Sequence, residues 1–323
     1  MRTRQLGNSD IELTTIGLGA WAIGGSGYAF GWGPQNDTDS IQTIHTALDL
    51  GINWVDTAPV YGLGHSEEIV GKAIRGVGER PYISTKCGLV WPADGKKVSH
   101  DLSATSVKRE CEASLKRLGI EVIDIYNIHW PIPDERIEEA WAAIADLIHA
   151  GKVRYGGVSN FSVEQARRVA SIHSVTSQQP PYSMLVRDIE HDVLPYCREK
   201  KIGVVVYSPM QNGLLTGKMN PERINALPKK DWRRRNQHFQ EPELTANLEL
   251  VYALSLIAEE LGRTPAQLAI AWAIAGDGVT SAIVGARRPE QIEENASASD
   301  LQLSEATTER IAELLRQRDE RLR

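Results

Sequence analysis

The segment that decides the fold is residues 119–131, with the sequence Gly-Ile-Glu-Val-Ile-Asp-Ile-Tyr-Asn-Ile-His-Trp-Pro. Within it, residues 122–129 are almost continuously apolar, which is typical of a parallel strand that is covered on both faces. The preceding stretch has a helical spacing of apolar residues that ends at a glycine, namely Val107, Cys111, Leu115 and Leu118 before Gly119. A helix followed directly by a buried strand indicates an alternating order of helices and strands.

The same alternation extends outward in both directions. Trp141, Ile144 and Ile148 have helical spacing before Gly151, and Ser162 with Gln165 forms a capping box that begins another helix. Strands are predicted at residues 16–21, 53–57, 82–86, 122–129, 154–159, 176–179, 202–207 and 280–284. Eight strands with intervening helices predict an α/β fold, a closed (β/α)8 TIM barrel.

The alternative architecture is an open, doubly wound sheet. Such a sheet usually carries a glycine-rich turn after its first strand, and Gly17-Leu18-Gly19 lacks the third glycine at the required spacing. Three segments lie outside the repeat: a hairpin at residues 2–13 that would close the bottom of the barrel, a long polar loop at 210–243 after the seventh strand, and an extra C-terminal helix at 304–323. With no linker between them, residues 1–323 are predicted to form a single domain.

Charge and composition exclude several classes of function. The net charge of −6 disfavours nucleic acid as a partner, since phosphate binding needs a basic face. No run of 18 apolar residues could cross a bilayer, and the three separated cysteines suit a reducing compartment, so a cytoplasmic location is expected. The histidines are scattered without the spacing of metal ligands, so no metal is predicted.

Polar side chains gather where the predicted strands end. Asp56, Lys86 and His129 each close a strand, and Tyr61 follows the second strand. Because catalytic groups of such barrels lie at the carboxyl ends of the strands, these side chains are expected to meet at one rim. Asp56 and Lys86, on neighbouring strands, could pair there, and Tyr61 would then lie near the ammonium.

These residues belong to motifs that resemble the aldo-keto reductase family. The resemblance covers nearly the whole chain, in order, through Val55-Asp56-Thr57-Ala58 with Tyr61-Gly62, Ser84-Thr85-Lys86, Ile128-His129-Trp130-Pro131, residues 156–161, residues 179–182, Tyr207-Ser208-Pro209 and residues 285–289 with Gln291, Glu294 and Asn295. It implies reduction of a small aldehyde or ketone by hydride transfer from NADPH. Tyr61 would be the general acid, its pKa lowered by Lys86, which Asp56 would orient, while His129 would position the substrate carbonyl.

The resemblance also implies where NADPH would bind. Ser159, Asn160 and Gln179 would hold the nicotinamide amide, and Tyr207 would stack on the ring. Arg287, supported by Gln291, would pair with the 2′-phosphate. The remaining cofactor positions implied, for the pyrophosphate and the adenine, are Ser208, Leu214, Gly217, Lys218, Gly285, Glu294 and Asn295.

Aromatic residues after the first and fourth strands suggest the substrate pocket: Trp21, Tyr28, Phe30, Trp32 and Trp130. Their character favours aromatic or apolar aldehydes. The basic run at residues 229–235, by contrast, is expected to be a solvated, mobile loop near the cofactor, given the acidic total.

Two other functions stay open at this point. One is an NADPH-binding regulatory module of the type of potassium-channel β subunits, which a complete set of reductase residues does not exclude. The other, a metal-dependent hydrolase or lyase, has little support in the histidine spacing. The sequence leaves the oligomeric state undetermined, and a monomer is plausible.

Overall fold

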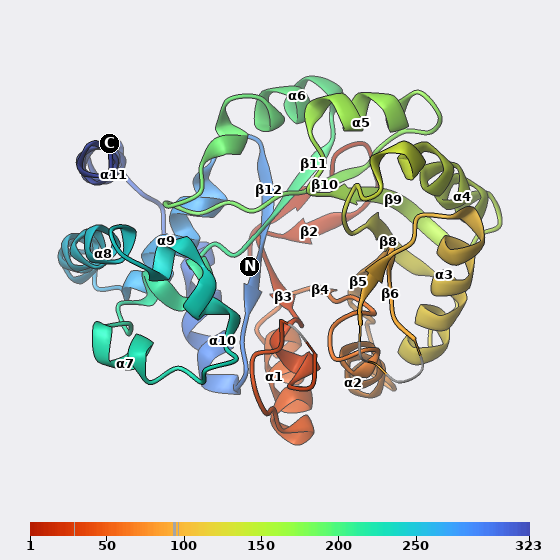
Figure 1. The fold of residues 1–323 in the computed structure, drawn as a ribbon, viewed down its shortest axis with the longest axis horizontal. Coiled ribbons are helices and arrows are strands. Elements are labelled where there is room, and N and C mark those ends of the chain that lie inside the picture. Colours follow the sequence, from red (N-terminus) through yellow and green to blue (C-terminus); the bar gives the residue numbers. More distant parts are fainter. Residues whose placement is uncertain (29, 93–94, 96) are drawn as a thin grey trace.

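The computed structural model describes residues 1–28, 30–92, 95 and 97–323. Parallel strands form a closed barrel in the order β10-β11-β12-β3-β4-β5-β8-β9, which confirms the predicted TIM barrel and rules out the open sheet (Figure 1). The barrel strands are β3 (Ile16–Gly19), β4 (Trp54–Asp56), β5 (Tyr82–Cys87), β8 (Ile123–Ile128), β9 (Val153–Ser159), β10 (Ser177–Gln179), β11 (Gly203–Tyr207) and β12 (Val279–Gly285). Each predicted strand is present, with ends that shift by one or two residues.

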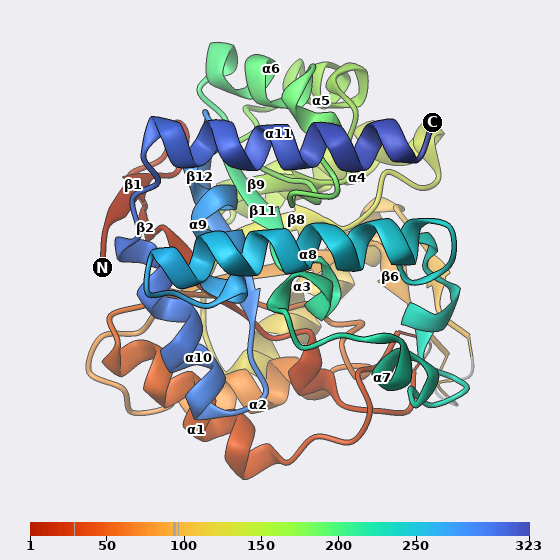
Figure 2. The same cartoon turned by 90° about the vertical axis from the view of Figure 1, so that its left-hand side faces the viewer.

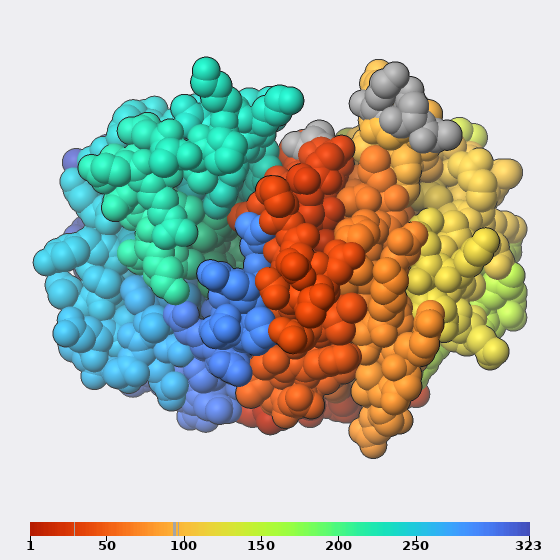
Figure 3. Space-filling model, turned by 90° about the horizontal axis from the view of Figure 1, so that it is seen from below, coloured from red at the N-terminus to blue at the C-terminus, as the bar shows by residue number. Residues whose placement is uncertain are grey.

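Helices surround the barrel and bury their apolar faces against it. They are α1 (Asp37–Asp49), α2 (His65–Ile74), α3 (Ala104–Leu118), α4 (Ile137–His149), α5 (Val163–Ala170), α6 (Val193–Lys200), α9 (Pro265–Ala275) and α10 (Pro289–Ala296). The predicted capping box of Ser162 and Gln165 is present at the start of α5. α1 contacts both α10 and α2, and in the space-filling view from below its red-orange segment lies between the blue segment of α10 and the orange one of α2 (Figure 3).

The hairpin closes the amino-terminal end of the barrel, as predicted. Strands β1 (Thr3–Gln5) and β2 (Glu12–Thr14) pair in antiparallel register. Leu6, Ile11 and Leu13 are fully buried and pack against inward side chains of the barrel, among them Trp54. A Cβ atom on Gly17 would lie 2.0 Å from the Trp54 ring, so the absence of a side chain there lets the indole fill the bottom layer.

Two helices form a layer outside the ring. α8 (Glu243–Glu260) and the C-terminal α11 (Glu305–Arg321) lie side by side (Figure 2). Their contact has an apolar part that includes Leu250, Leu254, Ile311 and Leu315, and ion pairs such as Arg310–Glu260 flank it. The predicted C-terminal helix is therefore present, and α8 is an element that the sequence reasoning did not identify. Across the described residues, no helix combines the length and apolarity needed to span a membrane.

The segment after β11 is more ordered than the expected polar loop. It contains α7 (Pro221–Asn225) and short 3-10 turns at Gln211–Thr216, Trp232–Arg235 and Gln237–Phe239. Leu214, Ile224 and Phe239 are buried and join the apolar cluster under α8. A second short hairpin, β6 (Leu89–Val90) with β7 (Ser99–His100), follows β5. Both segments extend from the carboxyl end of the barrel.

Candidate active site

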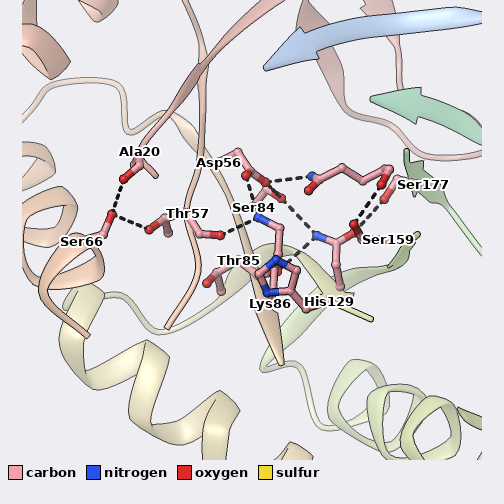
Figure 4. Close-up of polar contacts among 12 residues, drawn as sticks. Ala20, Asp56, Thr57, Ser66, Ser84, Thr85, Lys86, His129, Ser159 and Ser177 are labelled. Atoms are coloured by element: carbon pink, nitrogen blue, oxygen red, sulfur yellow. Dashed lines mark hydrogen bonds and ion pairs between the residues drawn. The ribbon is translucent and has the colours of Figure 1, made fainter. Parts of the chain in front are cut away.

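A buried ion pair occupies the carboxyl end of β4 and β5. Lys86 Nζ donates to Asp56 Oδ1 at 2.6 Å and to the carbonyl oxygen of Thr57 at 2.8 Å, and the lysine and aspartate are 1% and 3% exposed. The second carboxylate oxygen of Asp56 accepts hydrogen bonds from Ser84 and Gln179, each at 2.9 Å (Figure 4). Because both carboxylate oxygens accept hydrogen bonds and the ammonium donates two, both charges are tolerated away from water.

Two rings complete the predicted constellation. The Lys86 ammonium lies 5.2 Å from the centroid of the Tyr61 ring. The ring of His129 stands nearly perpendicular to that of Tyr61, at 82° and 5.9 Å between centroids. The side chains that the sequence places at three strand ends and in the loop after the second strand are therefore neighbours in the fold.

The ionisation of Tyr61 differs from the expectation that Lys86 lowers its pKa. The pKa of Tyr61 is raised well above its ordinary value of 10.0 by burial, and further by the negative charge of Asp56. The physical reason is that Asp56 balances the charge of Lys86, while burial disfavours a phenolate. The pKa of His129 is lowered well below its ordinary value by burial and by the positive charge of Lys86. The site therefore holds a neutral phenol beside a neutral imidazole.

Hydrogen bonds hold the adjoining polar residues in place. Asn160 donates to the carbonyl oxygen of His129 and to Ser159 Oγ, both at 3.0 Å, and accepts from the Tyr207 hydroxyl at 2.8 Å. Ser159 donates to the carbonyl oxygen of Gln179 at 2.9 Å. Asn160 and Ser208 follow β9 and β11 with left-handed φ of 63° and 57°, a conformation that is rare outside glycine and concentrates at functional sites.

A single long cavity of about 1730 Å³ runs across this end of the barrel. It is lined by all the predicted substrate-pocket residues, namely Trp21, Tyr28, Phe30, Trp32 and Trp130, and by Asp56, Tyr61 and His129. It is also lined by most of the predicted cofactor residues, namely Ser159, Asn160, Gln179, Tyr207, Ser208, Lys218, Gly285, Arg287, Gln291, Glu294 and Asn295. One space thus joins the aromatic residues to the cationic ones.

Two of the predicted phosphate-side residues lie elsewhere. Neither Leu214 nor Gly217 is among the residues that line the cavity. Leu214 is fully buried in the cluster under α8, because its apolar side chain packs into that core. Their neighbours Gly213, Thr216 and Lys218 do line it, so a contact of this loop with the pyrophosphate stays a prediction.

Arg287 has partners that the sequence did not indicate. Its Nε donates to Gln35 Oε1 at 2.8 Å and its Nη1 to the carbonyl oxygen of Trp32 at 3.2 Å, and it also contacts the carbonyl oxygen of Pro34. The backbone N–H of Arg287 donates to Gln291 Oε1 at 2.8 Å. Arg287 therefore fastens the segment between β3 and α1 to the rim of the cavity.

The basic run at residues 229–235, after β11, was predicted to be a solvated loop. This prediction is wrong for two of its residues. Trp232 and Arg233 line the cavity. Ser84 and Asn127 beneath the ion pair were also not identified; Asn127 donates to Ser84 Oγ at 3.1 Å. For Trp232 a signal existed, since a tryptophan among lysines and arginines is unusual for a segment that only faces water.

The chain is similar to proteins of one known family. The family model "Aldo/keto reductase family" matches residues 15–316. The chain is 40% identical to aldo-keto reductase YhdN of Bacillus subtilis (strain 168) over 299 residues, which is 91% of this chain and 87% of the relative. It is 35% identical to an NADH-specific methylglyoxal reductase of Escherichia coli (strain K12) over 329 residues, covering 97% and 98%.

A solved structure agrees with these sequence relatives. The glycerol dehydrogenase AKR11B4 from Gluconobacter oxydans superimposes with a TM-score of 0.90 at 36% identity, over 98% of this chain and 95% of that one. A family model across most of the chain, relatives above 30% identity over nearly its full length and a matching barrel lead to one conclusion. The chain belongs to the aldo/keto reductase family of oxidoreductases.

Proposed function

We propose that the protein reduces aldehydes or ketones to alcohols with NADPH, and that Tyr61 donates the proton. The observation that carries this proposal is the buried pair of Lys86 and Asp56, 2.6 Å apart, beneath Tyr61 and beside His129. A barrel held only by packing has no need of these groups at one rim, because a buried ion pair contributes little net stability. Their position at the wall of a long cavity favours chemistry on a bound carbonyl compound.

The cavity has features that fit a nicotinamide dinucleotide. Ser159, Asn160 and Gln179 offer amide and hydroxyl groups close to Tyr61, and the ring of Tyr207 offers a flat wall. Toward α10 the lining is cationic, with Lys218 and Arg287, which suits phosphate groups. Glu294 Oε1 is buried without a hydrogen-bond partner among the described residues, and it could accept from the amino group of an adenine.

In this proposal the cofactor, when bound, supplies a hydride to the carbonyl carbon. The hydroxyl of Tyr61 transfers its proton to the carbonyl oxygen, which gives the alcohol and a Tyr61 phenolate that water reprotonates. Because its pKa is high, Tyr61 is protonated before the reaction. The ammonium of Lys86 stabilises the negative charge as it develops on Tyr61. The neutral imidazole of His129 donates to the same carbonyl oxygen and sets its angle.

Preference for NADPH over NADH is part of the proposal. The relative from Escherichia coli is named NADH-specific, so membership of the family leaves both cofactors open. NADPH is favoured because the cations Arg287 and Lys218 line the cavity, and a 2′-phosphate could form charge-assisted hydrogen bonds with them.

The test is a panel of carbonyl compounds, followed by NADPH absorbance, with the wild-type protein and Tyr61→Phe. We expect turnover by the wild type and a loss of kcat of at least about 100-fold in the variant, as for removal of a general acid. Quenching of tryptophan fluorescence by NADPH should be equal in both proteins. Reduction at full rate by Tyr61→Phe would refute the role of Tyr61. Binding of NADPH by a wild type that turns over no carbonyl compound would favour the regulatory module.

A further inference from the structure

A tryptophan from a distant loop lies against the aromatic wall of the site. Trp232 stacks on Trp21 with ring centroids 5.3 Å apart and planes at 22°. Trp21 in turn lies 6.2 Å from the ring of Tyr61, with planes at 27°. All three rings line the cavity. Trp21 therefore connects the β11–α8 segment to the proposed proton donor.

A third indole, that of Trp32, closes this cluster. It meets Trp21 edge-on at 5.4 Å and 85°, and Trp232 at 5.6 Å and 87°. Its backbone is held by the Arg287 guanidinium through the carbonyl oxygen of Trp32. Such perpendicular and offset stacked pairs are the favoured geometries of aromatic rings. Figure 3 shows the two contributing segments, in red and in blue-green, rising at the same end of the molecule.

The neighbour of Trp232 fixes the loop that carries it. Arg233 places its guanidinium carbon 4.9 Å from the Trp32 ring centroid, a cation–π contact. The same guanidinium donates twice to Asp231, at 2.7 and 3.0 Å, and this pair is largely buried. Asp231 also accepts the backbone N–H of Arg233 at 3.0 Å. The contacts between Asp231 and Arg233 therefore stabilise the turn that carries Trp232.

We propose that Trp232 is a positioning residue that sets substrate preference by fixing the indole of Trp21 as a wall. Trp232 stacks on Trp21 and Trp32 meets it edge-on, so the indole of Trp21 is held in one orientation beside Tyr61. A rigid face binds a planar apolar group at low entropic cost, whereas an indole free to rotate must be ordered first. The favoured substrate class is the aryl aldehydes. This inference rests on the proposed function.

The experiment compares Trp232→Ala with Trp232→Phe, which keeps a ring for stacking. For 4-nitrobenzaldehyde, Trp232→Ala should raise KM about three- to tenfold with little change in kcat, as expected for the loss of one aromatic pair. Propanal has no ring that could contact Trp21. For propanal, KM and kcat of Trp232→Ala should therefore stay within about twofold of the wild-type values. Trp232→Phe should restore most of the KM. Near-ultraviolet circular dichroism should lose the signal of the stacked indoles in both Trp232 variants, since each removes one indole of the pair.

The matched control is Arg235→Ala, in the same 3-10 turn, because Arg235 is exposed and is not among the residues that line the cavity. It should behave as the wild type with both aldehydes. Equal losses by Trp232→Ala for the two aldehydes, or no rescue by Trp232→Phe, would overturn the inference.

A second measurement separates this inference from the proposed reaction. Calorimetric titration with 4-nitrobenzyl alcohol in the presence of NADPH needs no turnover, because the alcohol and the reduced cofactor form a complex that cannot react. Weaker binding by Trp232→Ala than by the wild type and Arg235→Ala supports the positioning role. This holds even if the wild type reduces no aldehyde, and that result would refute only the proposed reaction. Equal binding by all three proteins overturns the positioning role.

Discussion

The ammonium of Lys86 and the carboxylate of Asp56 lie 2.6 Å apart on adjacent strands, and both are shielded from water. Removing one partner leaves the other charge buried and unbalanced. We expect Lys86→Met and Asp56→Leu each to lower the free energy of unfolding by about 3–5 kcal/mol. The measurement is urea unfolding of the two single variants and of the double variant.

The double variant distinguishes a structural from a catalytic role of this pair. It replaces both charges with apolar side chains and should recover much of the lost stability. Its reductase activity should stay absent, because the charge that stabilises a Tyr61 phenolate is gone. A double variant that is both stable and active would contradict the proposed mechanism.

Arg287 should discriminate between the two cofactors. We expect Arg287→Ala to raise KM for NADPH by about 10- to 100-fold, the value of a charge-assisted hydrogen bond, and KM for NADH far less. The measurement is steady-state kinetics with each cofactor at a saturating concentration of aldehyde.

Gln35→Ala is the control for this effect, because Gln35 accepts from Arg287 Nε and donates to its carbonyl oxygen at 2.8 Å. It loosens the same segment but keeps the guanidinium, so the ratio of the two KM values should not change. If Arg287→Ala altered both KM values equally, the assignment to the 2′-phosphate would be wrong.

Glu110 should make stability depend on pH in the neutral range. Its carboxylate is 8% exposed and accepts from the backbone N–H of Gly88 and from Ser106 Oγ, both at 3.0 Å. Burial raises the pKa of Glu110 from 4.5 to about 7. Because the folded pKa lies above the unfolded one, its contribution to stability is complete below pH 4.5 and is lost as the pH rises through 7.

Urea unfolding of the wild type and of Glu110→Gln between pH 4.5 and about 7 checks the sign of this pH dependence. The free energy of unfolding of the wild type should fall relative to the variant by roughly 1.4 kcal/mol per pH unit at the steepest point. The two profiles should run parallel outside this range. If the free energies of unfolding of the two proteins changed in parallel at every pH, Glu110 would not titrate between pH 4.5 and about 7.

Gly17 should tolerate no side chain. A Cβ atom there would lie 2.0 Å from the ring of Trp54, which is fully buried. We therefore expect Gly17→Ala to destabilise the protein by about 1–3 kcal/mol or more, through overpacking. Gly78→Ala is the control, since nothing lies within 4 Å of its Cβ position. Equal midpoints of thermal unfolding in the two variants would contradict the packing of Trp54.

Much of the fold and of the site follows from local pattern in the sequence. A strand such as residues 122–129 is apolar throughout because it is buried on both faces, and its limits need no knowledge of its neighbours. Once eight such strands close a barrel, their carboxyl ends must converge, so Asp56, Lys86 and His129 could be grouped in advance. The extra helix α8 was missed because its apolar residues pack against α9 as well as α11, and the β11–α8 segment looked merely basic.

The sequence by itself therefore determined the barrel and the identity of the side chains at its rim, since periodicity and strand ends are properties of short segments. Only the tertiary structure decided how those groups ionise and which distant residues join them. Burial and Asp56 raise the pKa of Tyr61 where an isolated lysine would lower it. Trp21 and Trp232 meet although they are far apart in the chain. Both results depend on solvent exclusion and on contacts between distant loops, which no local pattern encodes.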